Sequence, residues 1–173
     1  MRYLELTCRV LLGVVFAVSV TGKLRDAAAF TDATRRLLPM RWASRDRVIA
    51  NSVGAVEFIV VALLAYPGTS RLGFALAAIL LIAFSVAIRA ALRRGVHAPC
   101  RCFGASDTPL GRRHLVRNGL LLVIALLGAL TPSGPLTPSG ACLAVGTGLV
   151  LATLVVRLDL VVELFLPHPS LRS

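Results

Sequence analysis

Two cysteines separated by a single arginine are the residues of this chain best suited to chemistry. Cys100 and Cys102 flank Arg101 in the stretch PCRCFG at 99–104. The thiolate is the nucleophile in disulfide exchange, and a neighbouring cation such as Arg101 stabilises it. A disulfide across one residue closes a small ring, and strained disulfides are the labile ones. The spacing therefore predicts a redox pair in which Cys100 and Cys102 cycle between dithiol and disulfide.

Two other roles for these cysteines stay open. With His97 they supply three metal ligands, and His114 completes a set of four only if the chain folds back. Closed zinc sites need four ligands, so we expect no metal. The cysteines could instead be inert packing residues, although a cationic segment is a poor place for inert burial. Cys8 and Cys142 fit that packing role better, with a second redox pair as the alternative.

The second chemical feature is Glu57, an acid near the middle of a long apolar stretch. A charged side chain at the centre of a bilayer costs about 2.5–3.5 kcal/mol or more, so Glu57 should face other helices and find a partner. Arg9 is the expected partner, since Lys23 lies nearer the membrane surface, and Asn51 could share the network. Glu57 is either a proton carrier during thiol oxidation, or a contact for a quinone, or half of a structural ion pair.

The composition indicates an integral membrane protein. The chain has 173 residues, of which 57% are hydrophobic and 16% charged, and its mean hydropathy is +0.82. Soluble domains are about 45–50% apolar and about 25% charged. The net charge of +11 would suggest nucleic acid as the partner of a soluble protein. We exclude nucleic acid because most basic residues lie in two short segments between apolar stretches.

Five apolar stretches approach the length of about 20 residues that a spanning helix needs. They are Leu4–Gly22, Val48–Tyr66, Leu72–Ile88, His114–Leu130 and Ala141–Leu160. Helices are expected because every backbone polar group must be satisfied within the hydrocarbon. The first stretch is interpreted as a span and not as a secretion signal, because Arg9 interrupts it. We predict an all-α, polytopic bundle of four to five transmembrane helices, forming one domain over 1–173 with a tail at 161–173.

The basic residues set an expected orientation. Lys23–Arg47 holds seven basic and three acidic residues, and Arg89–Arg117 holds seven basic and one acidic. The positive-inside rule places both segments in the cytoplasm, with the N-terminus outside and the C-terminus inside. A reducing cytosol would keep Cys100 and Cys102 mostly as thiols.

Three pairs of small residues could let helices approach closely in lipid. They are Gly13 with Ala17, Ala50 with Gly54, and Ala144 with Gly148.

Several of these stretches together resemble a known family. The segment LGVVFAVSVTGKL at 12–24 resembles the first-helix signature of the MauE/DoxX family of redox-associated membrane proteins. Glu57 in the second apolar stretch and Phe84-Ser85 in the third also fit, as does CRCFG at 100–104. This order holds over roughly residues 9–130. The Cys-x-Cys-Phe-Gly element is more typical of the MauE branch than of DoxX proteins at large.

The resemblance implies a membrane bundle of four or five helices with a redox-associated role. MauE proteins are linked to methylamine utilisation, where they are thought to help form disulfides in, or mature, methylamine dehydrogenase. They act beside a thioredoxin-like partner. That role would place Cys100 and Cys102 on the exported side of the membrane, whereas the charge pattern places them on the cytoplasmic side. We expect the orientation to follow the charges.

Three functions follow from this reading. The first is a membrane thiol-redox protein that passes electrons between a thioredoxin-like partner and another acceptor, with enzymatic turnover left open. The second is a non-catalytic scaffold for redox partners. The third is a small-molecule transporter. The sequence offers little support for transport, because it has a single intramembrane acid and no inverted repeat. The chain has no Rossmann fingerprint, P-loop or haem motif, so its cofactor is a membrane quinone or none.

Overall fold

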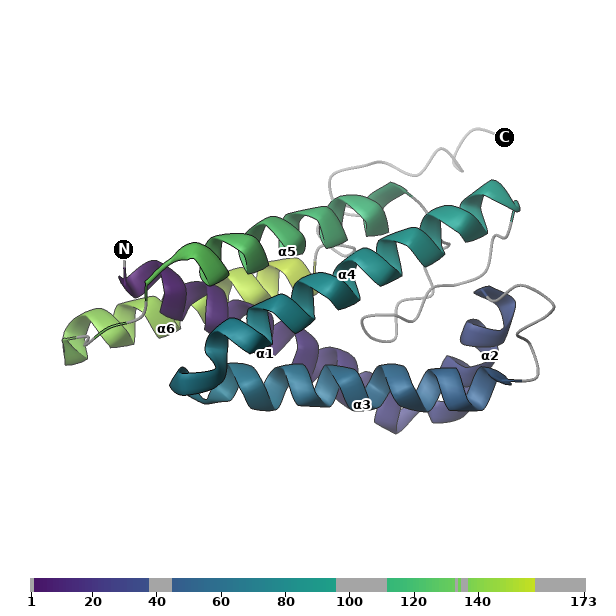
Figure 1. Cartoon of the computed structure of the whole chain (residues 1–173), viewed down its shortest axis with the longest axis horizontal. Coiled ribbons are helices and arrows are strands. Elements are labelled where there is room, and N and C mark those ends of the chain that lie inside the picture. Colours follow the sequence, from purple (N-terminus) through teal and green to yellow (C-terminus); the bar gives the residue numbers. More distant parts are fainter. Residues whose placement is uncertain (1, 38–44, 96–111, 133, 135–136, 158–173) are drawn as a thin grey trace, which may run out of the picture.

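The computed structural model is built of α-helices. It describes residues 2–37, 45–95, 112–132, 134 and 137–157, and these contain no strand. The helices are α1 (Arg2–Arg25), α2 (Ala27–Leu37), α3 (Asp46–Ala65), α4 (Ser70–Arg93), α5 (Arg112–Leu130) and α6 (Pro138–Val156), with a short 3₁₀ turn at Pro67–Thr69. They form an elongated bundle (Figure 1). The predicted all-α class is confirmed.

Five of the helices are long and apolar enough to cross a membrane, namely α1, α3, α4, α5 and α6. This confirms the prediction of four to five transmembrane helices, and each of the five overlaps one expected stretch. Large apolar side chains cover the outside of the bundle: Leu143 is 74% exposed, Phe58 63% and Ile79 63%. Such a surface suits hydrocarbon and not water. The chain is a multi-pass membrane protein.

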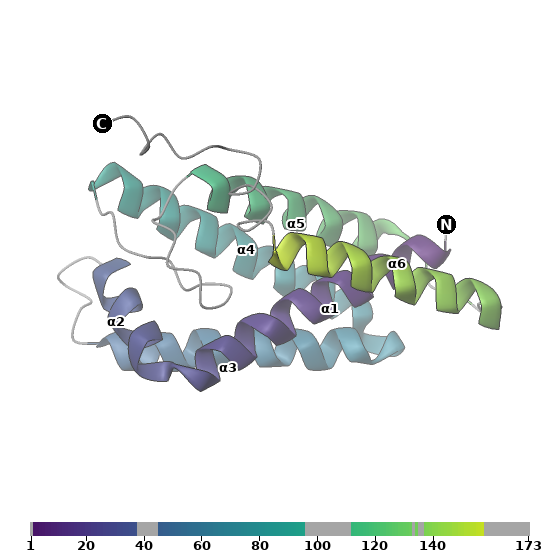
Figure 2. The ribbon, with the colours of Figure 1, turned by 180° about the vertical axis from the view of Figure 1, so that it is seen from behind.

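Helix α1 lies at the centre of the arrangement. It packs against α3, α5 and α6, and α4 packs against α3 and α5 (Figures 1 and 2). Helices α1 and α4 finish at the end of the bundle where α3 and α5 begin. We call this the basic end, because it carries arginines of four helices, among them Arg25, Arg47, Arg93 and Arg113. The turn at Pro67–Thr69 lies at the opposite end.

The contact between α1 and α6 is made by small residues. A Cβ added at Gly148 would lie 2.9 Å from Val10 Cβ and 3.0 Å from the carbonyl oxygen of Thr7. The Thr7 hydroxyl donates a hydrogen bond of 3.3 Å to the carbonyl of Ala144. The pair Ala144 and Gly148 is therefore a helix interface, as predicted.

The other two small-residue pairs are looser. A Cβ at Gly13 or at Gly54 would meet nothing within 4 Å. Ala50 is buried, but Gly54 is only partly so. These two pairs do not bring helix backbones together.

The segment Lys23–Arg47, expected to be a loop, contains a further helix. Helix α1 continues to Arg25, and α2 follows after Asp26. Helix α2 packs on α3 and also contacts α1 and α4. It buries Thr34 and half-buries Phe30, whereas Asp32 and Arg35 face outward. The prediction of a loop was wrong because a search for spans does not detect a short amphipathic helix, whose apolar face covers less than half of its surface.

Candidate functional site

Glu57 lies on the inward face of α3 and is completely buried. Lys23 of α1 forms an ion pair with Glu57 and donates a hydrogen bond to Oε1. The Ser19 hydroxyl donates to the same carboxylate, with Oγ 3.3 Å from each oxygen. Lys23 Nζ also donates to Ser19 Oγ at 3.0 Å. Ser19, Lys23 and Glu57, here named the Lys23–Glu57 cluster, thus form a connected polar group inside an apolar bundle.

Helical spacing explains how α1 supplies two members of this cluster. Ser19 and Lys23 are four residues apart, so they lie on one face of α1. That face packs against α3, the helix that carries Glu57. A hydroxyl and an ammonium group therefore converge on one carboxylate without any bend in either helix.

Two aromatic rings complete the surroundings of Lys23. Its Nζ lies 4.9 Å from the centroid of the Phe30 ring and 5.4 Å from that of Phe84. A cation near a ring face is attracted by the quadrupole of the ring, more strongly where water is excluded. Phe30 comes from α2 and Phe84 from α4, so four helices meet at this ammonium group. The helix that the sequence did not predict therefore forms part of the site.

Lys23 is unusual in this chain because it is the only lysine, the other eighteen basic residues all being arginine. Arginine stays charged in proteins, whereas a buried lysine gives up its proton more readily. The one basic side chain buried against Glu57 is thus the one type that is able to release a proton. Among the described residues, Lys23 and Glu57 are thus a buried base and a buried acid in direct contact.

Glu57 lies near the middle of α3. It is nine residues from Tyr66 at one end of the helix and eleven from Asp46 at the other. A helix rises 1.5 Å per residue, which places Glu57 about 14 Å from one end and about 16 Å from the other. The sequence also placed Glu57 near the middle of its apolar stretch.

The prediction that Arg9 is the partner of Glu57 was wrong. Arg9 pairs with Glu5 on its own helix, with Arg9 Nη1 4.0 Å from Glu5 Oε1. Arg9 is ten residues before Ser19, about 15 Å along α1 toward the opposite end of the bundle. Asn51 also lies outside the cluster: it is exposed and lines a pocket between α2 and α3. The burial of Glu57 was predicted from the sequence, but the register of α1 against α3 was not.

A second polar face lies on the first two turns of α5. His114, Arg117 and Asn118 are 5%, 4% and 1% exposed. Arg117 and Asn118 lie near the polar start of this helix and are nevertheless buried in the bundle. Their spacing of three and four residues puts all three on one side of α5. That spacing is the signal by which the face could have been found.

The register of α4 against α5 shows where this polar face lies along the long axis of the bundle. Gly128 of α5 lies against Phe74 of α4, since a Cβ at Gly128 would be 2.4 Å from the ring. The two helices are antiparallel, so ten residues further along each brings Asn118 level with Phe84. The Asn118 amide nitrogen, Nδ2, is buried and has no hydrogen-bond partner among the described residues. Buried polar groups thus occur on α1, α3 and α5 at similar depth.

The predicted redox residues Cys100, Arg101 and Cys102 lie outside the described residues, as does His97. Their segment joins α4 to α5, and both of those helices meet it at the basic end. Cys8 and Cys142 are both free thiols. Cys8 is buried in the core against apolar neighbours, whereas Cys142 is exposed. Among the described residues, no three or more His, Cys, Asp or Glu come together as metal ligands.

Comparison with protein families identifies the chain. The family model described as methylamine utilisation protein MauE matches residues 1–131. The chain belongs to the MauE family. The matched residues run from the start of α1 to the end of α5, so they include both the Lys23–Glu57 cluster and the Cys-x-Cys segment. Neither a search of curated proteins nor one of solved structures found a match.

Helix α6 lies outside the part that matches MauE, yet it packs closely on α1 through Gly148 and Ala144. The part of the chain that matches the family therefore contains four spans and the short α2, and the fifth span, α6, packs on the N-terminal half of α1. The buried polar side chains of the described residues all lie within the matched part.

Proposed function

We propose that this MauE-family protein is a membrane thiol-redox protein whose Cys100 and Cys102 exchange disulfides with a client. Membership of the family carries the proposal, because its matched region contains the Cys-x-Cys-Phe-Gly element in a chain with five membrane-spanning helices. Arg101 between the two cysteines favours the thiolate form that exchange requires. In the namesake family the client would be methylamine dehydrogenase, and a thioredoxin-like protein would be the redox partner.

The exchange balances without another reactant. The thiolate of one cysteine attacks a sulfur of the client disulfide, which forms a mixed disulfide and releases one client thiolate. The second cysteine then attacks the mixed disulfide, so that Cys100 and Cys102 become joined and the second client thiolate leaves. Two electrons pass to the client, and the two protons lost by the cysteines equal those that the client thiolates take up. The reverse sequence oxidises a client dithiol.

The Lys23–Glu57 cluster would carry protons for this chemistry. The protons leave at Cys100 and Cys102 and are taken up at the client, so they must move between the two dithiols, and an ionisable group inside a membrane is by default a candidate for a proton relay. The pair Lys23 and Glu57 neutralises by moving one proton from the ammonium to the carboxylate, which an arginine in place of Lys23 would prevent. Ser19 bonds to both groups and keeps them aligned.

A scaffold that only holds redox partners is the second candidate, because one observation favours it. Lys23 donates to both Ser19 and Glu57 within the cluster, and the pair joins α1 to α3. A closed ion pair of this kind also serves as a structural link. In this case neither cysteine would change its oxidation state during function.

Thiol trapping separates the two candidates. In a Cys8→Ala/Cys142→Ala background, only Cys100 and Cys102 remain to react with a maleimide, and each labelled thiol increases the mass of the protein. We expect both to be modified after reduction and neither after mild oxidation, and we expect Cys102→Ser or Cys100→Ser to accumulate a mixed disulfide with the client. The result that would exclude the redox function is an unchanged labelling pattern, together with full function of the Cys100→Ser/Cys102→Ser variant.

The side of the membrane is tested in the same membranes. The basic end should face the cytoplasm if the charges set the orientation. An impermeant maleimide added to intact cells should then leave Cys100 and Cys102 unmodified and react only after lysis. Labelling in intact cells would place the thiols on the exported side, as maturation of an exported client requires.

A further inference from the structure

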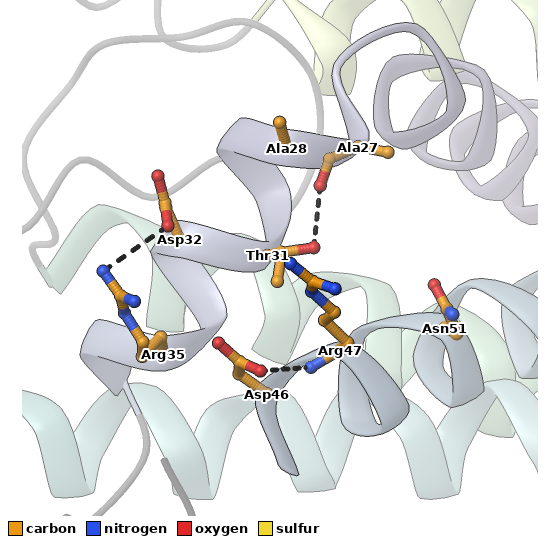
Figure 3. Close-up of a pocket in the computed structure, with 8 residues that line it drawn as sticks. All are labelled: Ala27, Ala28, Thr31, Asp32, Arg35, Asp46, Arg47 and Asn51. Atoms are coloured by element: carbon orange, nitrogen blue, oxygen red, sulfur yellow. Dashed lines mark hydrogen bonds and ion pairs between the residues drawn. The ribbon is translucent and has the colours of Figure 1, made fainter. Parts of the chain in front are cut away.

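A pocket with charged walls lies between α2 and α3 at the basic end, away from the Lys23–Glu57 cluster (Figure 3). Its volume is about 420 Å³. The residues that line it are Ala27, Ala28, Thr31, Asp32 and Arg35 of α2 with Asp46, Arg47 and Asn51 of α3. It exists because α2 folds back onto α3 after α1 ends. Small residues at the start of α2 leave the space open.

The charges of this pocket are of both signs. Asp32 and Arg35 form an exposed pair, with 3.7 Å between Oδ1 and Nη2. Asp46 accepts a hydrogen bond of 2.7 Å from the backbone N–H of Arg47. The Arg47 guanidinium points toward Thr31 of α2, and no carboxylate of the described residues pairs with it (Figure 3). The pocket therefore offers a guanidinium for an anion beside carboxylates for a cation.

The pocket lies at the depth of lipid head groups. Helix α3 has 20 residues from Asp46 to Ala65. At 1.5 Å per residue its length is about 30 Å, which equals the thickness of the hydrocarbon core. Tyr66 follows its far end and is 67% exposed, as is common for tyrosine at a membrane interface. Asp46 and Arg47 therefore lie at the boundary between acyl chains and head groups.

The pocket opens onto a surface suited to acyl chains. Asn51, Ala55, Phe58 and Ala62 are all exposed and recur every three or four residues along α3. This spacing forms one stripe on the outside of the helix, running from the pocket toward the opposite end. Val48, which is 65% exposed, lies beside its start. A molecule seated with its polar part in the pocket would lay an apolar tail along this stripe.

We propose that the pocket binds a phospholipid with a phosphoethanolamine head group in the leaflet at the basic end. Arg47 donates to the phosphate, and the Asn51 amide lies beside it. Asp46 and Asp32 accept hydrogen bonds from the primary ammonium group. A phosphocholine head has no N–H donor for these carboxylates, and a phosphoglycerol head has no cation. Both should bind more weakly. This inference is independent of the thiol chemistry.

Native mass spectrometry of the full-length protein in detergent tests the proposal. Phosphatidylethanolamine, phosphatidylcholine and phosphatidylglycerol with identical acyl chains are added at matched concentrations. We expect phosphatidylethanolamine to be retained best, and Arg47→Ala to lower its retention about tenfold, as loss of a charge-assisted hydrogen bond should. Asp46→Asn should weaken phosphatidylethanolamine but not phosphatidylglycerol. Arg157→Ala is the matched control, because Arg157 is an exposed arginine at the end of α6.

Three results would overturn the proposal. One is equal retention of the three lipids by the unaltered protein. Another is equal loss of phosphatidylethanolamine in Arg47→Ala and Arg157→Ala. The third is full competition by soluble phosphoethanolamine, which would show that the pocket takes a free zwitterion and not a lipid. Circular dichroism of each variant shows that α-helix content is retained, and thiol trapping of Cys100 and Cys102 stays a separate readout.

Discussion

The two halves of α1 bind their neighbours by different means. Near its start, α1 packs against α6 at Gly148 and Ala144, whose small size lets the two backbones approach. Near its end, α1 meets α3 through Ser19 and Lys23, where a buried charge pair makes the link. Lipid gives no hydrophobic drive for helices to associate, so packing and polar contacts must supply it. Of these two contacts, only the second contains ionisable groups, which is why we propose a proton-carrying role there.

The largest expected effect comes from breaking the charge pair. Glu57→Leu leaves the Lys23 ammonium buried without its partner, and such a change costs about 3–5 kcal/mol of the free energy of unfolding. The double variant Lys23→Met/Glu57→Leu removes both charges and should regain most of that loss. Urea or detergent unfolding followed by circular dichroism measures both. Additive losses in the double variant would show that the two residues do not act as a pair.

Lys23→Arg should separate charge from proton transfer. It keeps the positive charge, so we expect the free energy of unfolding to change by less than the Glu57→Leu variant does. Because arginine does not release its proton, thiol oxidation that depends on the pair should slow by about 100-fold, a typical contribution of general acid–base catalysis. The rate of disulfide formation between Cys100 and Cys102 is the measurement. An unchanged rate would assign the pair a structural role alone.

The stability of the contact between α1 and α6 should depend on the size of the side chain at position 148 and not on charge. Gly148→Ala places a methyl group against Val10 and the Thr7 carbonyl, so overpacking should cost about 1–3 kcal/mol. Gly13→Ala on the partner helix α1 is the control, since a Cβ there meets nothing within 4 Å. Thermal unfolding in detergent compares the two. Similar melting temperatures for both variants would argue that α6 is loosely attached.

The smallest effect is expected at the other charge pair of α1. Arg9 Nη1 and Glu5 Oε1 lie 4.0 Å apart on one helix, and within the described part of the chain Glu5 Oε1 accepts no hydrogen bond. Arg9 is partly exposed and able to reach water near the membrane surface. Glu5→Gln should therefore change the free energy of unfolding by less than about 1 kcal/mol. A loss as large as that of Glu57→Leu would mean that both pairs join helices.

The sequence predicted the parts of the fold that depend on composition. Long apolar runs fixed the five spans, and the cost of a charge in lipid fixed the burial of Glu57. It did not predict that Lys23 pairs with Glu57, because the register of α1 against α3 follows from how side chains interlock across the helices. Helix α2 was missed for a different reason, since it has too few apolar residues for a span. The redox role of Cys100 and Cys102 stays a prediction.

The position of the single lysine between Phe30 and Phe84 has a practical consequence. Biosynthetic labelling with isotope-labelled lysine would give one side-chain signal, because the chain has a single lysine. Aromatic ring currents should displace that signal from the position of a solvated amine. Spectra recorded during thiol oxidation would then report proton movement from inside the helix bundle.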